Sequence, residues 1–370
     1  MNPQPFYHRL SHSLLALGII TVAIYLGQDI LVPLAHSVLL AVLLRPLEKR
    51  LLKLGMHKVV AISLALFLAV LVVAGIGTLL SVQIANFMDD WPKLERNIDD
   101  VYRTVRRWVR REYKVSYRQQ EQYIEQVKDQ TTDSLNGVNT LGLITGPLGT
   151  ITLIPIYIFL LMYYRTMLLH FCQLLFPEQF TGRVREILGE IKAVIQSYVV
   201  GLLLETASVA ALNIVGLVVL GVQYAVLLGI MAAILNLIPY IGGLVATVLA
   251  VALTMVNHPQ IEVLLGVVAV FLFVQFIDNN ILVPLIVASK VRINALVSIV
   301  GVLIGGVLAG VSGMFLSIPV IAILKVIFDR VEGLEAWGVL LGDETPETKG
   351  DGLFKIRRRV QIYTGDEVDT

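Results

Sequence analysis

From Val199 to Gly221 the chain reads VVGLLLETASVAALNIVGLVVLG, with one charged residue, Glu205. This stretch lies within a longer run, 193–289, whose other charges are Glu262 and Asp278. A water-soluble fold of that length would need many solvated charges, so most of the run must face lipid or other buried helices. The sequence therefore predicts an all-α, polytopic integral membrane protein.

The composition of the whole chain supports this class and excludes others. Charged residues make up 15% and hydrophobic residues 56% of the 370 residues, whereas ordinary domains carry about 25% charged residues. The net charge of +1 argues against a nucleic-acid partner, which would require a basic excess. Cys172 is the one cysteine, which excludes an intrachain disulfide and a cysteine-cluster metal site. Catalytic and phosphate-binding motifs are lacking, so we expect neither an enzyme nor a cofactor.

Long apolar segments predict where the chain crosses the bilayer, since a spanning helix needs roughly 20 apolar residues. The eight candidates are Leu14–Leu26, Ile30–Leu44, Val59–Val82, Leu141–Tyr163, Tyr198–Leu220, Tyr224–Val256, Val263–Val287 and Ala295–Phe328. Gln28 and Asp29 separate the first two, which we expect to form a tilted hairpin. The segments 224–256 and 295–328 are long and interrupted by Gly and Pro, so each could be two full crossings or a re-entrant hairpin.

The positions of the basic residues predict the orientation. They cluster in 45–58, in 165–192 and around the last segment, which places these regions and both termini in the cytoplasm. The predicted organisation is N-terminal membrane helices (1–83), an outside helical insert (84–140), a fourth span with a cytoplasmic loop (141–192), a transport module (193–328) and a cytoplasmic tail (329–370).

The insert contains a heptad pattern that predicts a coiled-coil-like helix. Its apolar positions follow a 3–4 spacing and are Ile84, Phe87, Trp91, Leu94, Ile98, Val101, Val105 and Trp108. The seam could be buried within a two-helix hairpin, or it could join subunits of a homo-oligomer. The sequence leaves both open.

Polar residues inside apolar segments are the candidate binding groups, because charges at bilayer depth are rare and often functional. At about 100° per residue, Asn213 falls within about 80° of the direction of Glu205 on one helix. Glu205 is either a protonatable or cation-binding carboxylate facing water, or a neutral acid bonded to a neighbouring helix.

A second polar group is Asp278-Asn279-Asn280, with Gln275 one turn earlier and Pro284 after it. Its oxygen atoms could bind a hard cation such as sodium, or a hydroxylated substrate. Alternatively, the triplet fastens one helix to another through hydrogen bonds.

The interruptions supply the remaining candidates. Asn236, Pro239, Gly242 and Gly243 are typical of a helix break whose free polar groups face a cavity, although a simple kink or turn has the same pattern. The small-residue pairs Gly301/Gly305, Gly306/Gly310 and Ala309/Gly313 indicate close helix contacts, or a sliding surface for a moving hairpin.

The run 193–289 contains no Lys or Arg, which bears on mechanism. A partner for Glu205 and Asp278 must then be a distant base (Arg165, Lys290 or Arg292), a proton, a metal cation or a cationic substrate. This motivates the hypothesis of cation coupling, with a cation at Asp278.

Several motifs in the region 236–325 resemble those of the autoinducer-2 exporter (AI-2E) family of bacterial membrane proteins. The matching residues are Pro239–Gly243, the Asp278 triplet with Pro284, the glycine run 305–313 and Pro319. The resemblance implies an oligomeric inner-membrane transporter that exports a small organic solute or signalling molecule, and some relatives are implicated in sodium/proton exchange. We therefore expect an ion-coupled exporter; the alternatives are a cation antiporter and a non-transporting oligomeric scaffold.

Overall fold

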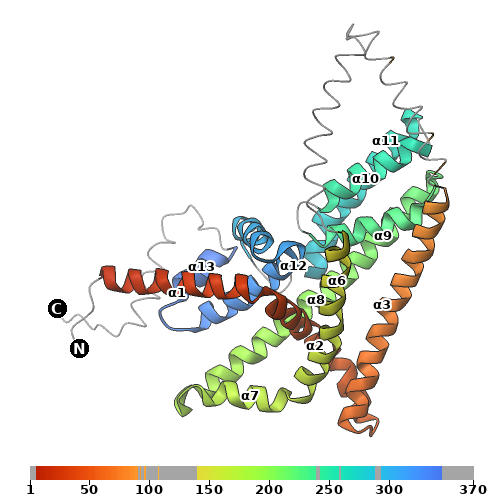
Figure 1. Cartoon of the computed structure of the whole chain (residues 1–370). Coiled ribbons are helices and arrows are strands. Elements are labelled where there is room, and N and C mark those ends of the chain that lie inside the picture. Colours follow the sequence, from red (N-terminus) through yellow and green to blue (C-terminus); the bar gives the residue numbers. More distant parts are fainter. Residues whose placement is uncertain are drawn as a thin grey trace.

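The computed structural model describes residues 6–90, 92, 96, 107, 140–238, 242–257, 260–287 and 293–343. Most of the predicted coiled coil therefore lies outside the described residues, as do Pro239, Lys290 and Arg292. All secondary structure in the described part is helical, as Figure 1 shows, which confirms the predicted class.

Each predicted apolar segment overlaps one or more helices. The bounds of the described helices are α1 Phe6–Leu26, α2 Gln28–Lys53, α3 Lys58–Asp89, α6 Thr140–Tyr163, α7 Arg165–Leu174, η1 Glu178–Phe180, α8 Thr181–Val219, α9 Ala225–Asn236, α10 Gly242–Asn257, α11 Ile261–Ile277, η2 Asp278–Val287, α12 Ala295–Arg330 and α13 Glu335–Leu341. Of these, α7, η1 and α13 lie outside the predicted segments. Five described helices are long and apolar enough to cross a membrane, and six if the bent pair α6–α7 is one span.

The junction between α1 and α2 corrects one prediction, since the first two segments do not form a hairpin. Gly27 donates a backbone hydrogen bond to Ala23, and its own carbonyl accepts from Ile30 and Leu31. Helical hydrogen bonding thus continues through the junction, and the chain bends without reversing (Figure 1). Asp29 enters the first turn of α2, where a negative charge favours helix formation.

Helix α8 packs against two different groups of helices along its length. Near its middle, Tyr198 and Val199 pack with Leu39 of α2 and Leu316 of α12. Nearer its end, Leu217 packs with residues of α9, α10 and α11. With 39 residues, α8 is about 58 Å long, so it extends well beyond a hydrocarbon core of about 30 Å.

The interrupted segment 224–256 folds back on itself as a helical hairpin. It forms α9 and α10, of 12 and 16 residues, about 18 and 24 Å long, each too short to cross a bilayer singly. Ala232 of α9 and Ala246 of α10 share one buried cluster. At the turn, a side chain on Gly242 would overlap the carbonyl of Leu235.

The segment 295–328 reverses in the same way, although it is long enough to count as one span. Ala309 and Gly310 have non-helical backbone angles, and Gly310 is in the left-handed region. Side chains added at Gly305 or Gly313 would overlap the other's carbonyl. The small residues thus mediate close packing between the two halves of a second hairpin.

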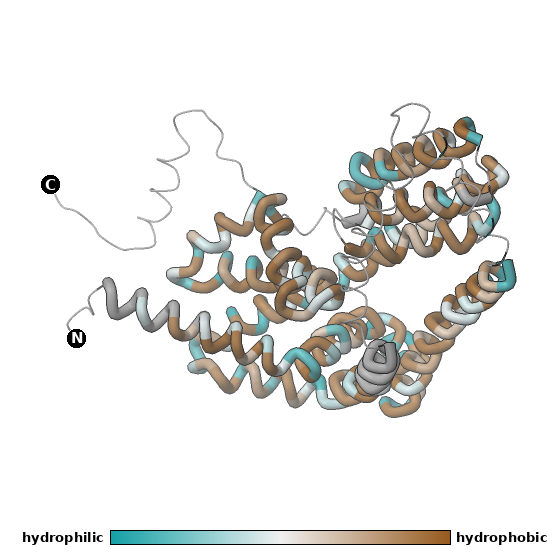
Figure 2. The backbone as a smooth tube through the Cα atoms, turned by 45° about the horizontal axis from the view of Figure 1, so that its top comes forward, coloured by the Kyte–Doolittle hydropathy of each residue, from teal (hydrophilic) through white to brown (hydrophobic). Residues whose placement is uncertain are grey.

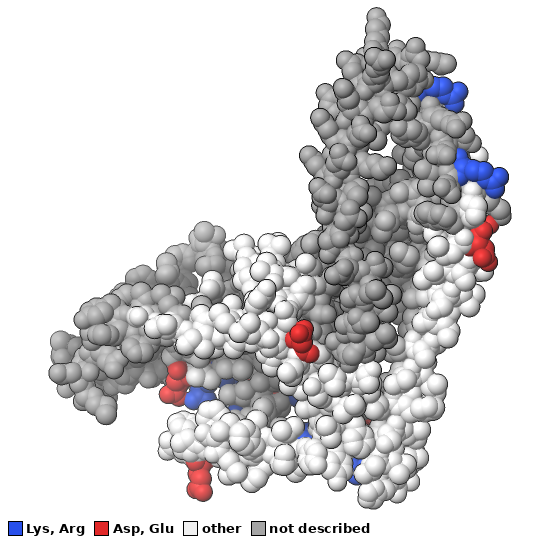
Figure 3. Space-filling view, in the orientation of Figure 1, with Lys and Arg blue, Asp and Glu red and all other residues white. Residues whose placement is uncertain are grey.

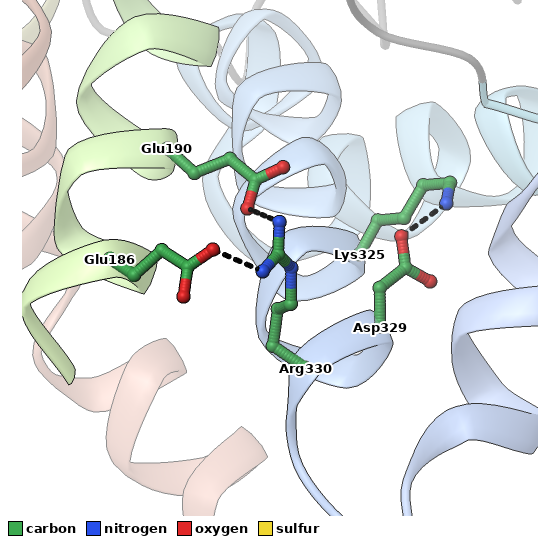
Figure 4. A network of polar contacts seen from close by, with 5 residues as sticks. All are labelled: Glu186, Glu190, Lys325, Asp329 and Arg330. Atoms are coloured by element: carbon green, nitrogen blue, oxygen red, sulfur yellow. Dashed lines mark hydrogen bonds and ion pairs between the residues drawn. The ribbon is translucent and has the colours of Figure 1, made fainter. Parts of the chain in front are cut away.

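The described basic residues of the three regions lie at one end of the helices. Lys58 donates to the carbonyl of Tyr163, which brings the start of α3 to the end of α6. Arg330, at the end of α12, bonds Glu186 and forms an ion pair with Glu190 (Figure 4). The base of the insert, at the end of α3, lies at the opposite end (Figure 1).

Between these ends the surface is apolar. Figure 2 shows hydrophobic residues along the length of the long helices, with hydrophilic ones mostly near their ends. The described surface in Figure 3 carries few charges. This is the surface expected of helices surrounded by lipid.

Candidate functional site

One face of α8 carries the first two predicted site residues into the interior. Its buried residues recur every three or four positions, which is the spacing of a single helix face, and include Tyr198, Gly201, Glu205, Val209, Asn213 and Leu217. Glu205 is 8% and Asn213 2% exposed. Val209, between them, packs with Ala233 of α9 and Val274 of α11.

Asp278 marks a change in helical winding. Helix α11 ends at Ile277, and the chain continues as the π-helix η2, which contains Pro284. π-helical turns are rare and often occur at functional sites. Because proline lacks a backbone N–H, and because a π-helix bonds five residues apart, Pro284 leaves the carbonyl of Asn279 without its helical donor.

The polar triplet faces more than one direction. Asp278 is 3% exposed, and its Oδ2 accepts a 2.9 Å hydrogen bond from Nδ2 of Asn236. Asn280 instead donates to the carbonyl of Phe276, four residues earlier in α11, at 2.8 Å. Asn279 accepts from Gln275 at 3.3 Å. Asp278 is therefore the member of the triplet that points inward.

These helices enclose a small pocket beside Asp278, with room for about one water molecule or a bare ion. Its lining residues are Val209, Asn213, Ala232, Asn236, Gly243, Ala246, Phe271, Val274, Gln275 and Asp278. Gly243 permits this geometry, because a side chain there would overlap Oε1 of Gln275 and lie 3.5 Å from Oδ1 of Asn236.

Two oxygen atoms at the pocket have no hydrogen-bond partner among the residues that the structure describes. Oδ1 of Asp278 and Oδ1 of Asn213 are buried and unpaired, whereas Nδ2 of Asn213 donates to the carbonyl of Val209 at 3.0 Å. Buried polar atoms are normally paired, and an unpaired one requires a physical explanation. Carboxylate and amide oxygens are the ligands that hard cations prefer.

The oxygen-rich lining does not resemble a transition-metal site. Within the described residues, no group of three or more His, Cys, Asp or Glu side chains could hold a metal. Imidazole and thiolate ligands would suit zinc, copper or iron, whereas oxygen ligands suit alkali and alkaline-earth cations. The arrangement can bind a small hard cation or a proton.

The structure brings some predicted site residues together and separates others. Asn213, Asn236, Gly243, Gln275 and Asp278 line one pocket. Asn279 and Asn280 do not line it, Gly242 packs at the hairpin turn, and Pro239 lies outside the described residues. Glu205 is not a lining residue either, but it lies close enough to Asp278 for their charges to interact.

The acids have no basic partner in the described part of the chain. Its ion pairs join Arg45 to Glu48, Arg183 to Glu332, Lys325 to Asp329, and Arg330 to Glu186 and Glu190. Arg165, one of the three predicted candidates, interacts instead with Arg45 and Glu48. Neither Glu205 nor Asp278 is paired with it.

Sequence reasoning missed the apolar part of the lining. Ala232 precedes Asn236 by one helical turn, and Ala246 follows Gly243 by nearly one turn. This spacing puts each alanine on the same face as its polar neighbour. Once Asn236 and Gly243 had been assigned to the pocket, this spacing could therefore have predicted Ala232 and Ala246 as lining residues.

Comparison with known proteins agrees with the family resemblance of the sequence motifs. The family model described as "AI-2E family transporter" matches residues 14–333. The chain is 27% identical over 338 residues to "AI-2 transport protein TqsA" of Escherichia coli (strain K12), covering 90% of this chain and 94% of the relative. It is 25% identical over 264 residues to "Putative transport protein YueF" of Bacillus subtilis (strain 168), covering 69% and 70%.

Proposed function

Because the chain belongs to the AI-2E family of membrane transporters, we propose that it exports a small organic solute across the bacterial inner membrane, driven by a cation that binds beside Asp278. The observation that carries the proposal is the convergence of four oxygen-bearing side chains on one pocket: Asn213, Asn236, Gln275 and Asp278. They come from α8, α9, α11 and η2, so binding there can affect how these helices pack.

The uncompensated negative charge of Asp278 is the reason for proposing a bound cation. A buried carboxylate without a compensating charge is costly at bilayer depth, and the described ion pairs provide none for Asp278. A proton or a sodium ion would supply that charge. The unpaired oxygens of Asp278 and Asn213 would be two ligands of such an ion.

The pocket size separates the ion from the organic solute. Space for about one water molecule is enough for a bare ion and far too small for an organic molecule. The solute would enter when the α9–α10 hairpin or the α12 hairpin moves, as broken helices do in other secondary transporters. A signalling molecule such as AI-2, which the name of the Escherichia coli relative specifies, is the first solute to test.

The same small pocket favours a second candidate, a sodium/proton antiporter that moves no organic solute. Two acids that interact electrostatically, Glu205 and Asp278, could exchange one sodium ion for protons. Both functions use the same pocket and differ in whether an organic solute crosses with the ion.

The proposal includes the orientation of the chain in the membrane. The shared end of the three basic regions supports a cytoplasmic location for that end, with both termini on that side and the insert 84–140 outside. The heptad seam of the insert would hold the subunits of a homo-oligomer together.

Purified protein reconstituted in proteoliposomes tests the two functions. Labelled AI-2 should leave the interior only when a sodium or proton gradient is imposed across the vesicle membrane. A pH change inside the vesicles on addition of sodium, with no organic solute present, would favour the antiporter. Solute release at the same rate with and without the sodium and proton gradients would contradict the coupling of solute export to a cation.

A further inference from the structure

A second cluster of charged side chains lies at the basic end of the molecule, away from the Asp278 pocket. Its acidic centre is Glu48 of α2, which is fully buried and pairs with Arg45 one turn earlier at 2.5 Å. Arg165, at the start of α7, interacts with both residues. Lys192 of α8 interacts with Arg45, Arg165 and Lys49.

The charges in this cluster do not balance. Glu48 interacts with Arg45 and Arg165, while Lys192 is repelled by Lys49, Arg165 and Arg45. In addition, Nε of Arg45 is buried without a hydrogen-bond acceptor among the described residues, and both carboxylate oxygens of Glu48 are buried there without a hydrogen-bond donor. A buried donor without an acceptor and an excess of positive charge are both relieved by an anion.

The helix beside the cluster has the character of a membrane-surface helix. α6 and α7 meet at an angle of 66°, so if α6 spans the bilayer, α7 runs closer to its plane. Large apolar side chains on and just after α7 are exposed, including Met167, Phe171, Leu174 and Phe176. A helix with an exposed apolar face beside basic residues is typical of the lipid interface.

We propose that this cluster binds the phosphate of an anionic phospholipid, whose acyl chains lie against the apolar residues of α7. Arg45 and Arg165 offer planar donor groups that can bind two phosphate oxygens at once, and Lys192 adds a further donor. Lys58 donates to the Tyr163 carbonyl and lies 5.0 Å from the centre of that ring. Tyrosine and lysine are residues that anchor a helix end at the headgroup level.

Charge complementarity and the adjoining apolar face favour a lipid over a free phosphate compound. A soluble phosphate would satisfy the cations but would leave the face of α7 uncovered. A phospholipid satisfies both, and its acyl chains add hydrophobic binding energy for each buried methylene.

Native mass spectrometry of the full-length protein in detergent tests the proposal. The protein is incubated with phosphatidylglycerol, with phosphatidylcholine of the same chain length, or with glycerol 3-phosphate. Each basic residue near a lipid surface contributes about 1 kcal/mol, or roughly fivefold in affinity. The double variant Arg165→Gln, Lys192→Gln should therefore bind phosphatidylglycerol about 25-fold more weakly.

Two variants serve as controls. The charge-conserving double variant Arg165→Lys, Lys192→Arg should retain most phosphatidylglycerol binding. Arg183→Gln removes a charge from the same end of the molecule, where Arg183 pairs with exposed Glu332, and it should bind like the wild type. If the double variant fails to fold, Lys192→Gln alone should show a fivefold loss.

Equal binding of phosphatidylglycerol to the wild type and to the glutamine variants would overturn the proposal. Binding of phosphatidylcholine as tight as that of phosphatidylglycerol would overturn the role of charge. Binding of glycerol 3-phosphate as tight as that of phosphatidylglycerol would show a soluble phosphate site and would overturn the lipid as occupant.

Discussion

The side-chain amide of Asn236 donates a 2.9 Å hydrogen bond to the carboxylate of Asp278, which joins the end of α9 to the first residue of η2. The other carboxylate oxygen of Asp278 has no hydrogen-bond partner in the described part of the chain and lies beside the pocket. One residue thus contributes both to holding the α9–α10 hairpin in place and to the proposed ion site. Ion binding and hairpin position are coupled if the ion competes with this hydrogen bond or strengthens it.

Replacement of Asn236 by alanine tests the contribution of this hydrogen bond. It leaves a second carboxylate oxygen buried without a donor, which costs about 1–3 kcal/mol. We expect a lower melting temperature in detergent, measured by differential scanning fluorimetry. The loss should shrink in an Asp278→Asn background. Asn280→Ala is the control, because Asn280 is exposed and bonds the carbonyl of Phe276; an equal loss there would contradict the assignment.

Replacement of Gly243 by alanine tests whether the pocket must stay open. The added methyl group would overlap Oε1 of Gln275 and fill space that the proposed ion needs. We expect transport in proteoliposomes to be abolished, with a stability loss of about 1–3 kcal/mol from overpacking. Gly189→Ala in α8 is the control, because open space surrounds that position. Full activity of the Gly243→Ala variant would show that the pocket plays no part in transport.

Chemical cross-linking tests the reversal of α12. A side chain on Gly301 would contact Ile321, whereas a continuous helix would place these positions about 30 Å apart. Gly301→Cys with Ile321→Cys, in a Cys172→Ala background, should be joined within one chain by a short bifunctional thiol reagent. Each single variant is the control. Failure of the double variant to cross-link in membranes would mean that α12 is straight there.

Tyr224 connects the turn before α9 to the end of α3, and this contact depends on pH. Its hydroxyl donates a hydrogen bond to Oδ2 of Asp90 at 2.5 Å, and its ring meets Phe87 edge to face. Partial burial, followed by the hydrogen bond to Asp90 and its charge, raises the pKa of Tyr224 to about 12. A raised pKa in the folded state means that the protonated tyrosine stabilises the fold.

This stabilisation is fully present below about pH 10, the pKa of a free tyrosine, and is lost as the pH rises through about 12. Tyr224→Phe should therefore lower stability at pH 8 by about 1 kcal/mol. The difference between variant and wild type should disappear toward pH 12 in urea unfolding monitored by tryptophan fluorescence. A difference that stays constant over this range would contradict the role of the hydroxyl.

The class of the protein was predictable because charge content alone constrains it. A run such as 193–289, with three charges, cannot form a water-soluble fold. Its apolar segments are long enough to cross a membrane as helices. The reversals at Gly242 and Gly310 were one of two alternatives that the sequence left open, since glycine permits a straight helix as well as a turn. The bend at Gly27 was predicted as a reversal, because Gln28 and Asp29 resemble a polar loop when their place in the first turn of α2 is unknown.

The candidate site was predictable in its residue types and not in its geometry. Three consecutive residues on a helix point in different directions, about 100° apart, so at most one of Asp278, Asn279 and Asn280 could face the pocket squarely. The π-helical winding of η2 changes these directions, and it depends on packing and on Pro284. Glu205 shares a buried face with Asn213, as the 80° estimate predicted, yet it lies beside the pocket rather than on its lining.

The most direct test of cation coupling at Asp278 compares Asp278→Asn with the wild type in proteoliposomes, with solute flux measured at several sodium concentrations and pH values. Glu262→Gln is the matched control, because Glu262 is an exposed acid in the same apolar run and does not line the pocket. We expect flux through the Asp278→Asn variant to be independent of sodium and pH, while the control keeps the wild-type dependence. An unchanged dependence in Asp278→Asn would contradict the account.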